Sequence, residues 1–170
     1  ILGRAFNAED DSATCASPGA VLSYGFWQRE FAGDREVVGR TVSLDGHSFP
    51  VIGVAPPAFF GVEVGRAFDV TVPLCADQLI AEDKKGRRPR PDGWWLAIMG
   101  RLKPGWTVER ANAQMQTLAP GIMEATLPPT YLPDSAKRYL ANKLVVGAAG
   151  SGISGLRRQY ERPLWVLMAT

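Results

Sequence analysis

Apolar and polar positions alternate in short blocks through the first half of the chain, and glycine, proline or small polar residues bound each block. Blocks of this length are typical of short strands and single helices. The pattern predicts a helix at 24–31 that Ser23 caps, a helical turn at 77–82, and strands at 20–22, 41–44, 49–54 and 70–74. Asp45-Gly46 separates the second and third of these strands and predicts a hairpin, because both turn positions require positive φ.

The second half has longer apolar runs. Residues 94–102 are apolar nearly throughout, which predicts a central strand buried on both faces and assigns Trp94 and Trp95 to a core. Residues 143–146 predict a final strand, and a helix is expected from about Ser154 into the apolar end.

One longer helix is expected in this half, beginning at Val108 after the capping residue Thr107. Its apolar residues follow helical spacing and predict one core-facing stripe, made of positions 108, 111, 115, 118 and 122. Pro120 is expected to kink or end the helix near Ala119, with 121–125 continuing it after a break.

Short strands mixed with separated helices indicate an α+β fold. A chain of 170 residues is long enough for one domain or two small lobes. Residues 83–93 form the least apolar segment and are interpreted as a loop between two lobes. The chain also begins and ends within an apolar pattern, so we expect it to be a piece of a longer protein.

Composition limits the class of protein to which this chain can belong. An apolar fraction of 46% with 21% charged residues is that of a folded protein, and a net charge of +2 gives no reason to expect nucleic acid as a partner. No apolar run reaches the roughly 18–20 residues of a membrane-spanning helix. Cys15 and Cys75 leave two alternatives, one disulfide in an oxidising compartment or two unpaired thiols.

No catalytic, cofactor or metal site is predicted, and the chain is not expected to be an enzyme. Residues 150–155 match the dinucleotide pattern G-x-G-x-x-G, but only fifteen residues follow Gly155, too few for the remainder of a βαβ unit. A glycine hinge is therefore the favoured interpretation. His47 adjoins the Asp-Gly turn as an expected exposed hairpin residue, and alone it makes neither a typical zinc site nor a catalytic triad.

Two features are candidates for contact with a partner. Phe59 and Phe60 lie in an expected loop, where paired aromatics can form an apolar contact with another chain. The run 84–90 contains five basic residues, among them the candidate contacts Lys84, Lys85, Arg87 and Arg88. Such a run attracts phosphates, an acidic partner or lipid headgroups, and its alternative is a solvated loop.

Several segments together resemble the extracytoplasmic core domain of MacB-type ABC transporter permeases, within the broader FtsX-like permease group. They are Ala-Val-Leu-Ser-Tyr-Gly-Phe-Trp at 20–27, Val-Gly-Arg-Thr-Val-Ser-Leu-Asp-Gly at 38–46, Val-Ile-Gly-Val-Ala-Pro-Pro at 51–57, Asp-Val-Thr-Val-Pro-Leu at 69–74, Gly-Arg-Leu-Lys-Pro-Gly at 100–105 and Glu-Arg-Pro-Leu at 161–164. Their order along the chain fits the family throughout.

The resemblance implies two lobes, one inserted in the other. Residues 1–93 would be mostly the inserted distal lobe, and residues 94–150 a membrane-proximal α/β lobe that is incomplete on its N-terminal side. Residues 151–170 would be a glycine hinge and a helix leading to a transmembrane span. The family implies a location on the periplasmic side of the bacterial inner membrane.

The implied function is mechanical and non-catalytic. A cytoplasmic ATPase would drive transmembrane helices whose movement reaches this domain, and a periplasmic adaptor protein and a second copy in a dimer are the implied partners. The chain has no Walker A lysine or phosphate cradle, so it should not bind ATP itself. The alternative is a soluble binding or adhesion module that uses the Phe59-Phe60 loop and the basic loop 84–90. A nucleotide-dependent oxidoreductase has only the glycine pattern in its favour.

Overall fold

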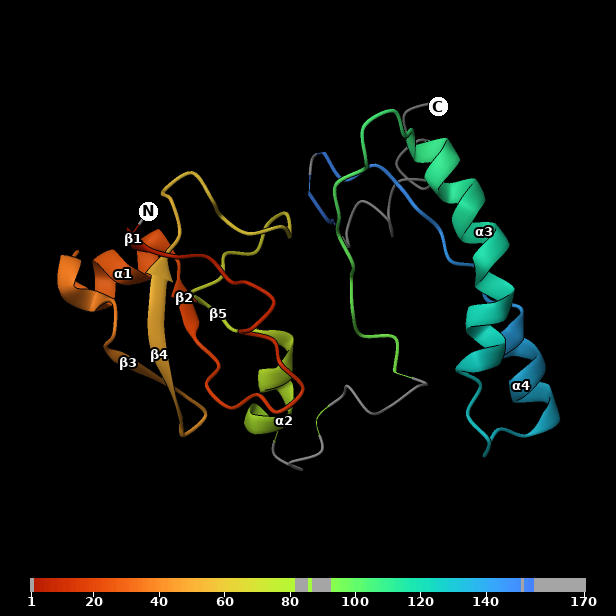
Figure 1. Ribbon diagram of the computed structural model, residues 1–170, viewed down its shortest axis with the longest axis horizontal. Helices are drawn as coiled ribbons and strands as arrows, with labels where there is room; N and C mark the ends of the chain where they lie inside the picture. The colour runs from red at the N-terminus through yellow and green to blue at the C-terminus, as the bar shows by residue number, and fades with distance from the viewer. Residues whose placement is uncertain (1, 82–85, 87–92, 151, 155–170) are drawn as a thin grey trace, which may run out of the picture. The chain divides into compact units, whose positions relative to one another are not determined.

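The computed structural model describes residues 2–81, 86, 93–150 and 152–154 of the chain. The chain divides into two compact units (Figure 1). Unit 1 comprises residues 1–86 with 151–170, and unit 2 comprises residues 87–150.

Unit 1 is built on a small mixed sheet with the strand order β1-β4-β2-β5, and β3 pairs with β4 outside that path. Strands β2 and β4 are parallel, and the other pairs are antiparallel. The strands are β1 (Leu2–Gly3), β2 (Ala20–Leu22), β3 (Thr41–Leu44), β4 (His47–Val54) and β5 (Val70–Thr71). The helices are α1 (Tyr24–Phe31) and α2 (Asp77–Ile80), with the 3-10 turns η1 (Arg35–Val37) and η2 (Leu74–Ala76). With the helices of unit 2, this confirms the α+β class.

Local signals set the start of α1 and the β3–β4 turn as predicted. The strand predicted at 70–74 is shorter, since β5 ends at Thr71 and Leu74 begins η2, and the turn predicted at 77–82 is the helix α2, which ends at Ile80. The hydroxyl of Ser23 accepts a hydrogen bond from the Phe26 N–H at 3.1 Å, which starts α1 at Tyr24. Asp45 and Gly46 have φ values of 49° and 81°, as a two-residue hairpin turn requires. This tight turn places His47 opposite Leu44, so β4 begins two residues before the predicted start at Phe49.

The core of unit 1 lies where α1 and η1 pack against β2 and β4. Its buried members are Ala20, Leu22, Trp27, Val37, Val42, Phe49, Val51, Val54 and Ala76. Trp27 also donates its indole N–H to the carbonyl oxygen of Asp34 at 2.8 Å, so its polar atom is satisfied within the core.

Strand β1 was not predicted, because residues 1–19 show no alternating pattern. It pairs with the end of β4, with Gly3 opposite Gly53. A Cβ on Gly53 would lie 2.4 Å from the carbonyl oxygen of Arg4, and one on Gly3 would lie 2.2 Å from that of Ile52. Only a pair of glycines allows this close approach of the two backbones.

A disulfide between Cys15 and Cys75 joins the N-terminal loop to η2, with the two Cα atoms 5.4 Å apart. The structure thus decides between the two alternatives that the sequence left open for these thiols. The Asp11 carboxylate accepts a hydrogen bond from the Cys75 N–H at 2.6 Å and adds a second link at this point.

Unit 2 contains α3 (Val108–Ala125) and α4 (Pro133–Leu140), which contact each other. The predicted break at Pro120 is wrong, since α3 is continuous through it. The buried side chains of this helix are Ala119 and Met123, beside and one turn after the proline, and their packing offsets the missing backbone donor. The predicted stripe is shifted accordingly, because Leu118 and Ile122 are exposed.

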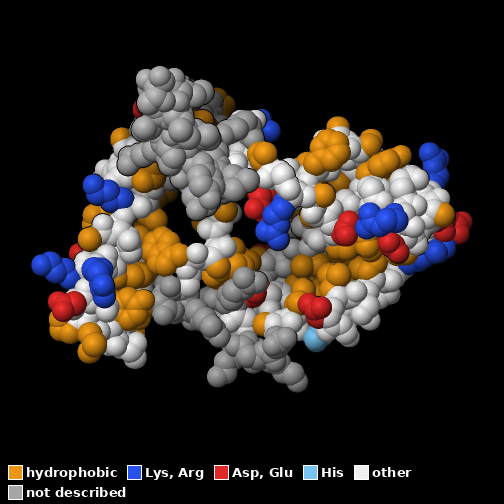
Figure 2. All heavy atoms as spheres, turned by 180° about the vertical axis from the view of Figure 1, so that it is seen from behind, with side chains coloured by type: hydrophobic (Ala, Val, Ile, Leu, Met, Phe, Trp, Pro, Cys, Tyr) orange, Lys and Arg blue, Asp and Glu red, His pale blue; other side chains and the backbone are white. Residues whose placement is uncertain are grey.

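The strands predicted at 94–102 and 143–146 are absent from the described part of unit 2. Trp94 is 60% exposed and Ile98 is 93% exposed, so the first segment is not a buried central strand, although the Trp94 ring lies 6.1 Å from that of Tyr139. Figure 2 shows apolar side chains across the surface of this unit. An apolar segment becomes a strand only when another strand pairs with its backbone. Its composition does not show whether the fold supplies that partner.

The backbone of the second segment bonds to α3 instead. Leu144 accepts a hydrogen bond from the Gln116 side chain at 2.6 Å, and the Val146 N–H donates to the Asn112 side chain at 3.0 Å. Helix α4 begins at Pro133, and the first turn of a helix is a position that suits proline. This helix was not predicted from the sequence, because Pro133 belongs to a proline-rich connection.

Candidate functional site

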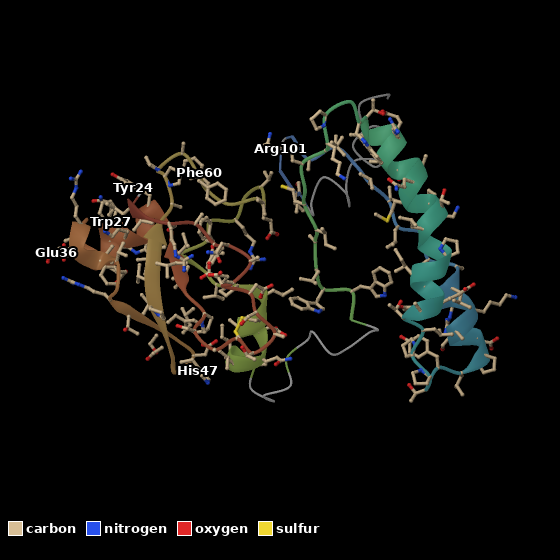
Figure 3. All side chains as sticks on the ribbon, viewed as in Figure 1. Tyr24, Trp27, Glu36, His47, Phe60 and Arg101 are labelled. Atoms are coloured by element: carbon tan, nitrogen blue, oxygen red, sulfur yellow. A yellow bond between two sulfur atoms is a disulfide. The ribbon has the colours of Figure 1, made fainter. Side chains whose placement is uncertain are left out.

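The candidate site is the loop between β4 and β5, and we call residues 59–68 the apolar loop. It starts after a turn in which the Phe59 N–H donates to the Pro56 carbonyl at 2.9 Å. The rings of Phe59 and Phe68 meet edge to face with centroids 5.6 Å apart, which closes the loop on itself. Phe60 has no such ring partner among the described residues and is 73% exposed (Figure 3).

The apolar loop surrounds a shallow hollow of about 570 Å³. Its wall includes Phe60, Val62, Val64 and Ala67, so the lining is largely apolar. Glu63 and Arg66 also line it and neutralise each other through an ion pair of 3.4 Å. An apolar surface with a neutral rim is suited to contact with another polypeptide rather than to binding a charged small molecule.

A distant part of the chain completes the hollow. We call residues 152–154 the return segment, because it follows unit 2 in sequence and packs in unit 1. The Ile153 N–H donates to the Val62 carbonyl at 2.7 Å, and the Val64 N–H donates to the Ile153 carbonyl at 2.8 Å. Ile153 thereby forms an isolated parallel bridge with Glu63.

Phe59 and Phe60 are therefore exposed loop residues, as the sequence predicted, while their role in partner contact stays a prediction. The candidate contacts Lys84, Lys85, Arg87 and Arg88 lie outside the described residues. Sequence reasoning did not find Gly152 and Ile153 as neighbours of this loop, since about ninety positions separate them from it. The only available signal was the glycine pattern at 150–155, which we interpreted as a hinge.

Glu63 is the one carboxylate in the apolar loop, and the loop contains no histidine or cysteine. In the described ranges, no three His, Cys, Asp or Glu side chains are grouped as a metal site would require. His47 is exposed at the start of β4, as predicted, with its Nδ1 3.2 Å from the Asp45 carbonyl oxygen, whereas the apolar loop follows the other end of that strand (Figure 3).

An ion pair holds the N-terminal loop of unit 1 together. The Arg4 guanidinium donates to both carboxylate oxygens of Asp10, at 2.6 and 2.7 Å, and the Asn7 N–H donates to the same group at 2.8 Å. The Asp10 side chain is 6% exposed. The hydrogen bond from Arg4, followed by that from Asn7, lowers the pKa of Asp10 from 3.8 to about 2.

This pKa predicts an acid-sensitive contribution to stability. A carboxylate whose pKa is lower in the folded state stabilises the protein fully above its unfolded pKa of 3.8, and that contribution is lost as pH falls through about 2. We expect Asp10→Asn to be less stable than the parent chain at neutral pH, with the difference closing between pH 4 and pH 2. Urea unfolding at a series of pH values measures this, with the exposed Glu36→Gln as control. An unchanged difference at pH 2 and pH 7 would contradict the assignment.

Comparison with known proteins adds one finding to this geometry. A sequence model of the family described as MacB-like periplasmic core domain matches residues 1–118, which include the whole described sheet and the apolar loop. No curated protein and no solved structure matches the chain. Within the described residues, no helix has the length and apolar character that crossing a membrane requires.

Proposed function

Because the chain belongs to the family of MacB-like periplasmic core domains, we propose that it relays ATPase-driven movement of a permease to partner proteins outside the cytoplasm. It is an extracytoplasmic domain of an ABC transporter permease, a class that works with a cytoplasmic ATPase. Domains of this family are generally non-enzymatic. The family match over residues 1–118 is the observation that carries the proposal, and it favours the permease over a soluble binding module.

The organisation of unit 1 supports a relay by a rigid body. The disulfide, the ion pair between Arg4 and the buried Asp10 carboxylate, and the mixed sheet tie the N-terminal loop, β4 and η2 together. A body that moves as one piece passes a displacement on without absorbing it in internal deformation. We propose that unit 1 is the inserted distal lobe, predicted from the sequence as residues 1–93.

The connection between the units supports the same proposal. The chain leaves unit 1 after Gly86 and returns to it after Gly150, so the backbone passes between the units twice. We propose that unit 2, predicted as residues 94–150, is the membrane-proximal lobe, and that 151–170 leads through a glycine hinge toward a transmembrane helix. The location proposed for the whole is the periplasmic face of a bacterial inner membrane.

The proposed partner contact is the apolar loop, through Phe59 and Phe60. The proposed basic contacts come later in the sequence, after α2, and are Lys84, Lys85, Arg87 and Arg88. An exposed aromatic on an apolar, neutral surface is the type of side chain that anchors protein interfaces. The proposed partners are a second copy of the permease and a periplasmic adaptor protein.

Spin labels in the full-length permease, assembled with its ATPase in lipid nanodiscs, test the relay. Cys15 and Cys75 are paired, so an introduced Glu36→Cys provides a separate thiol for labelling in this domain. We expect the distance distribution between the labels of two copies to change between the nucleotide-free and ATP-bound states. An identical distribution in both states of a complex that hydrolyses ATP would overturn the relay.

A label on Phe60→Cys in the same complex tests the contact. We expect its mobility to fall on assembly relative to the 170-residue chain alone, because a partner surface covers it. The label on Glu36→Cys is the matched control and should keep its mobility. If both labels stay equally mobile, the apolar loop is not the contact, while the relay is judged separately by the distances.

A further inference from the structure

The return segment pairs with the apolar loop, which is the proposed contact surface, and directly precedes residues 155–170 in sequence. Two backbone hydrogen bonds make the pairing, from the Ile153 N–H to Val62 and from the Val64 N–H to Ile153. It is an isolated bridge rather than part of a sheet. Isolated strand pairs are marginal in water, so this pairing can open without unfolding of the sheet.

Glycines on both sides make the close approach possible. Gly152 has a φ of +80°, and a Cβ on it would lie 3.0 Å from the Val62 carbonyl oxygen and from a methyl carbon of Val64. On the loop side, Gly61 and Gly65 have φ values of +101° and +81° and flank the paired residues 62–64. The paired stretch is therefore bounded by residues that change backbone conformation at low cost.

The return segment also shapes the surface that a partner would meet. Gly152 forms part of the wall of the hollow, whose other lining residues all belong to the apolar loop. Withdrawal of Ile153 would leave the Val62 carbonyl and the Val64 N–H without these partners and would open the wall at Gly152. Phe60 lines the same hollow, so this opening would change the surface beside its ring.

We propose that the return segment is a strap that sets the conformation of the apolar loop, so that displacement of the chain after Ile153 changes how Phe60 is presented. Coupling of this kind is reciprocal, and a partner that binds the strapped form of the loop holds the strap in place. The observations for the strap all come from unit 1. The cause of the displacement, movement of the permease, rests on the proposed function.

Hydrogen exchange of the Val64 amide in the 170-residue chain tests the strap. Gly152→Ala places a methyl group against Val62 and Val64 and forces a φ unfavourable for alanine. We expect the Val64 amide to exchange about tenfold faster in this variant, since its hydrogen bond to Ile153 is weakened. Gly150→Ala is the matched control, because a Cβ there meets no atom within 4 Å, and its Val64 amide should exchange at the parent rate.

A second variant keeps the test independent of steric effects at Gly152. Ile153→Pro removes the N–H that donates to Val62 and should accelerate exchange at Val64, whereas Ile153→Val keeps the donor and should not. Amides of β4 report whether the sheet itself stays folded. Parent-rate exchange at Val64 in both Gly152→Ala and Ile153→Pro would overturn the strap.

The coupling is tested in the full-length permease with its ATPase. We expect protection of the peptide 60–68 to differ between the nucleotide-free and ATP-bound states. If that protection is the same in both states while the Glu36→Cys label distances change, the strap does not respond to movement and only this inference fails. If neither changes, the relay itself fails.

Discussion

Loss of the Cys15–Cys75 disulfide should lower the free energy of unfolding of unit 1 by about 4 kcal/mol. The bond closes a loop with a sequence separation of 60 residues, and an unfolded chain without it gains the conformational freedom of that loop. The Asp11–Cys75 hydrogen bond links the same two segments in the folded state but does not restrict the unfolded chain as a covalent bond does. We therefore expect Cys15→Ser to unfold at a markedly lower urea concentration than the oxidised parent.

Reduction provides the control for this experiment. The parent chain in a thiol reductant should converge on the behaviour of Cys15→Ser, which itself should not respond to the reductant. Hydrogen exchange of the β4 amides follows unit 1 separately from unit 2. Equal stability of the oxidised and reduced parent would show that the cross-link does not stabilise the fold.

Phe49→Ala should lower the free energy of unfolding of unit 1 by about 3–5 kcal/mol. Phe49 has 0% exposure and is among the largest fully buried side chains, in the cluster with Leu22, Val37 and Val51. Truncation removes its burial and leaves a cavity that the short strands around it cannot fill by moving.

Phe60→Ala is the matched control, with the same change of side chain at a position that is 73% exposed. It should shift the free energy of unfolding by no more than about 0.5 kcal/mol. Denaturant unfolding followed through the β4 amides compares the two variants. Similar losses in both would mean that Phe49 does not lie in the core of unit 1.

Phe49, Phe60 and the two cysteines show that the sequence predicts some structural features and leaves others open. The sequence predicted Phe49 in a strand and Phe60 in a loop, and the structure shows the first buried and the second exposed. The pairing of two cysteines depends on their distance in space, which no local pattern encodes. The sequence predicted the apolar loop as a contact candidate, but its hollow depends on Gly152, far along the chain.

The amino-acid sequence by itself determined several short-range elements of this protein and indicated its family. Ser23, Thr107 and the Asp45-Gly46 turn act on backbone groups within a few residues, and each began or ended its element as predicted. The resemblance in ordered short segments likewise identified a family that the comparison confirmed.

Only the tertiary structure decided which distant backbones meet. It pairs β1 with β4 through Gly3 and Gly53, joins Cys15 to Cys75, and places Ile153 against the apolar loop. It also left 94–102 and 143–146 without the ladders that their composition predicted. A helix cap or a tight turn depends on nearby residues, whereas a strand ladder or a disulfide forms only when the rest of the fold brings its second partner within reach.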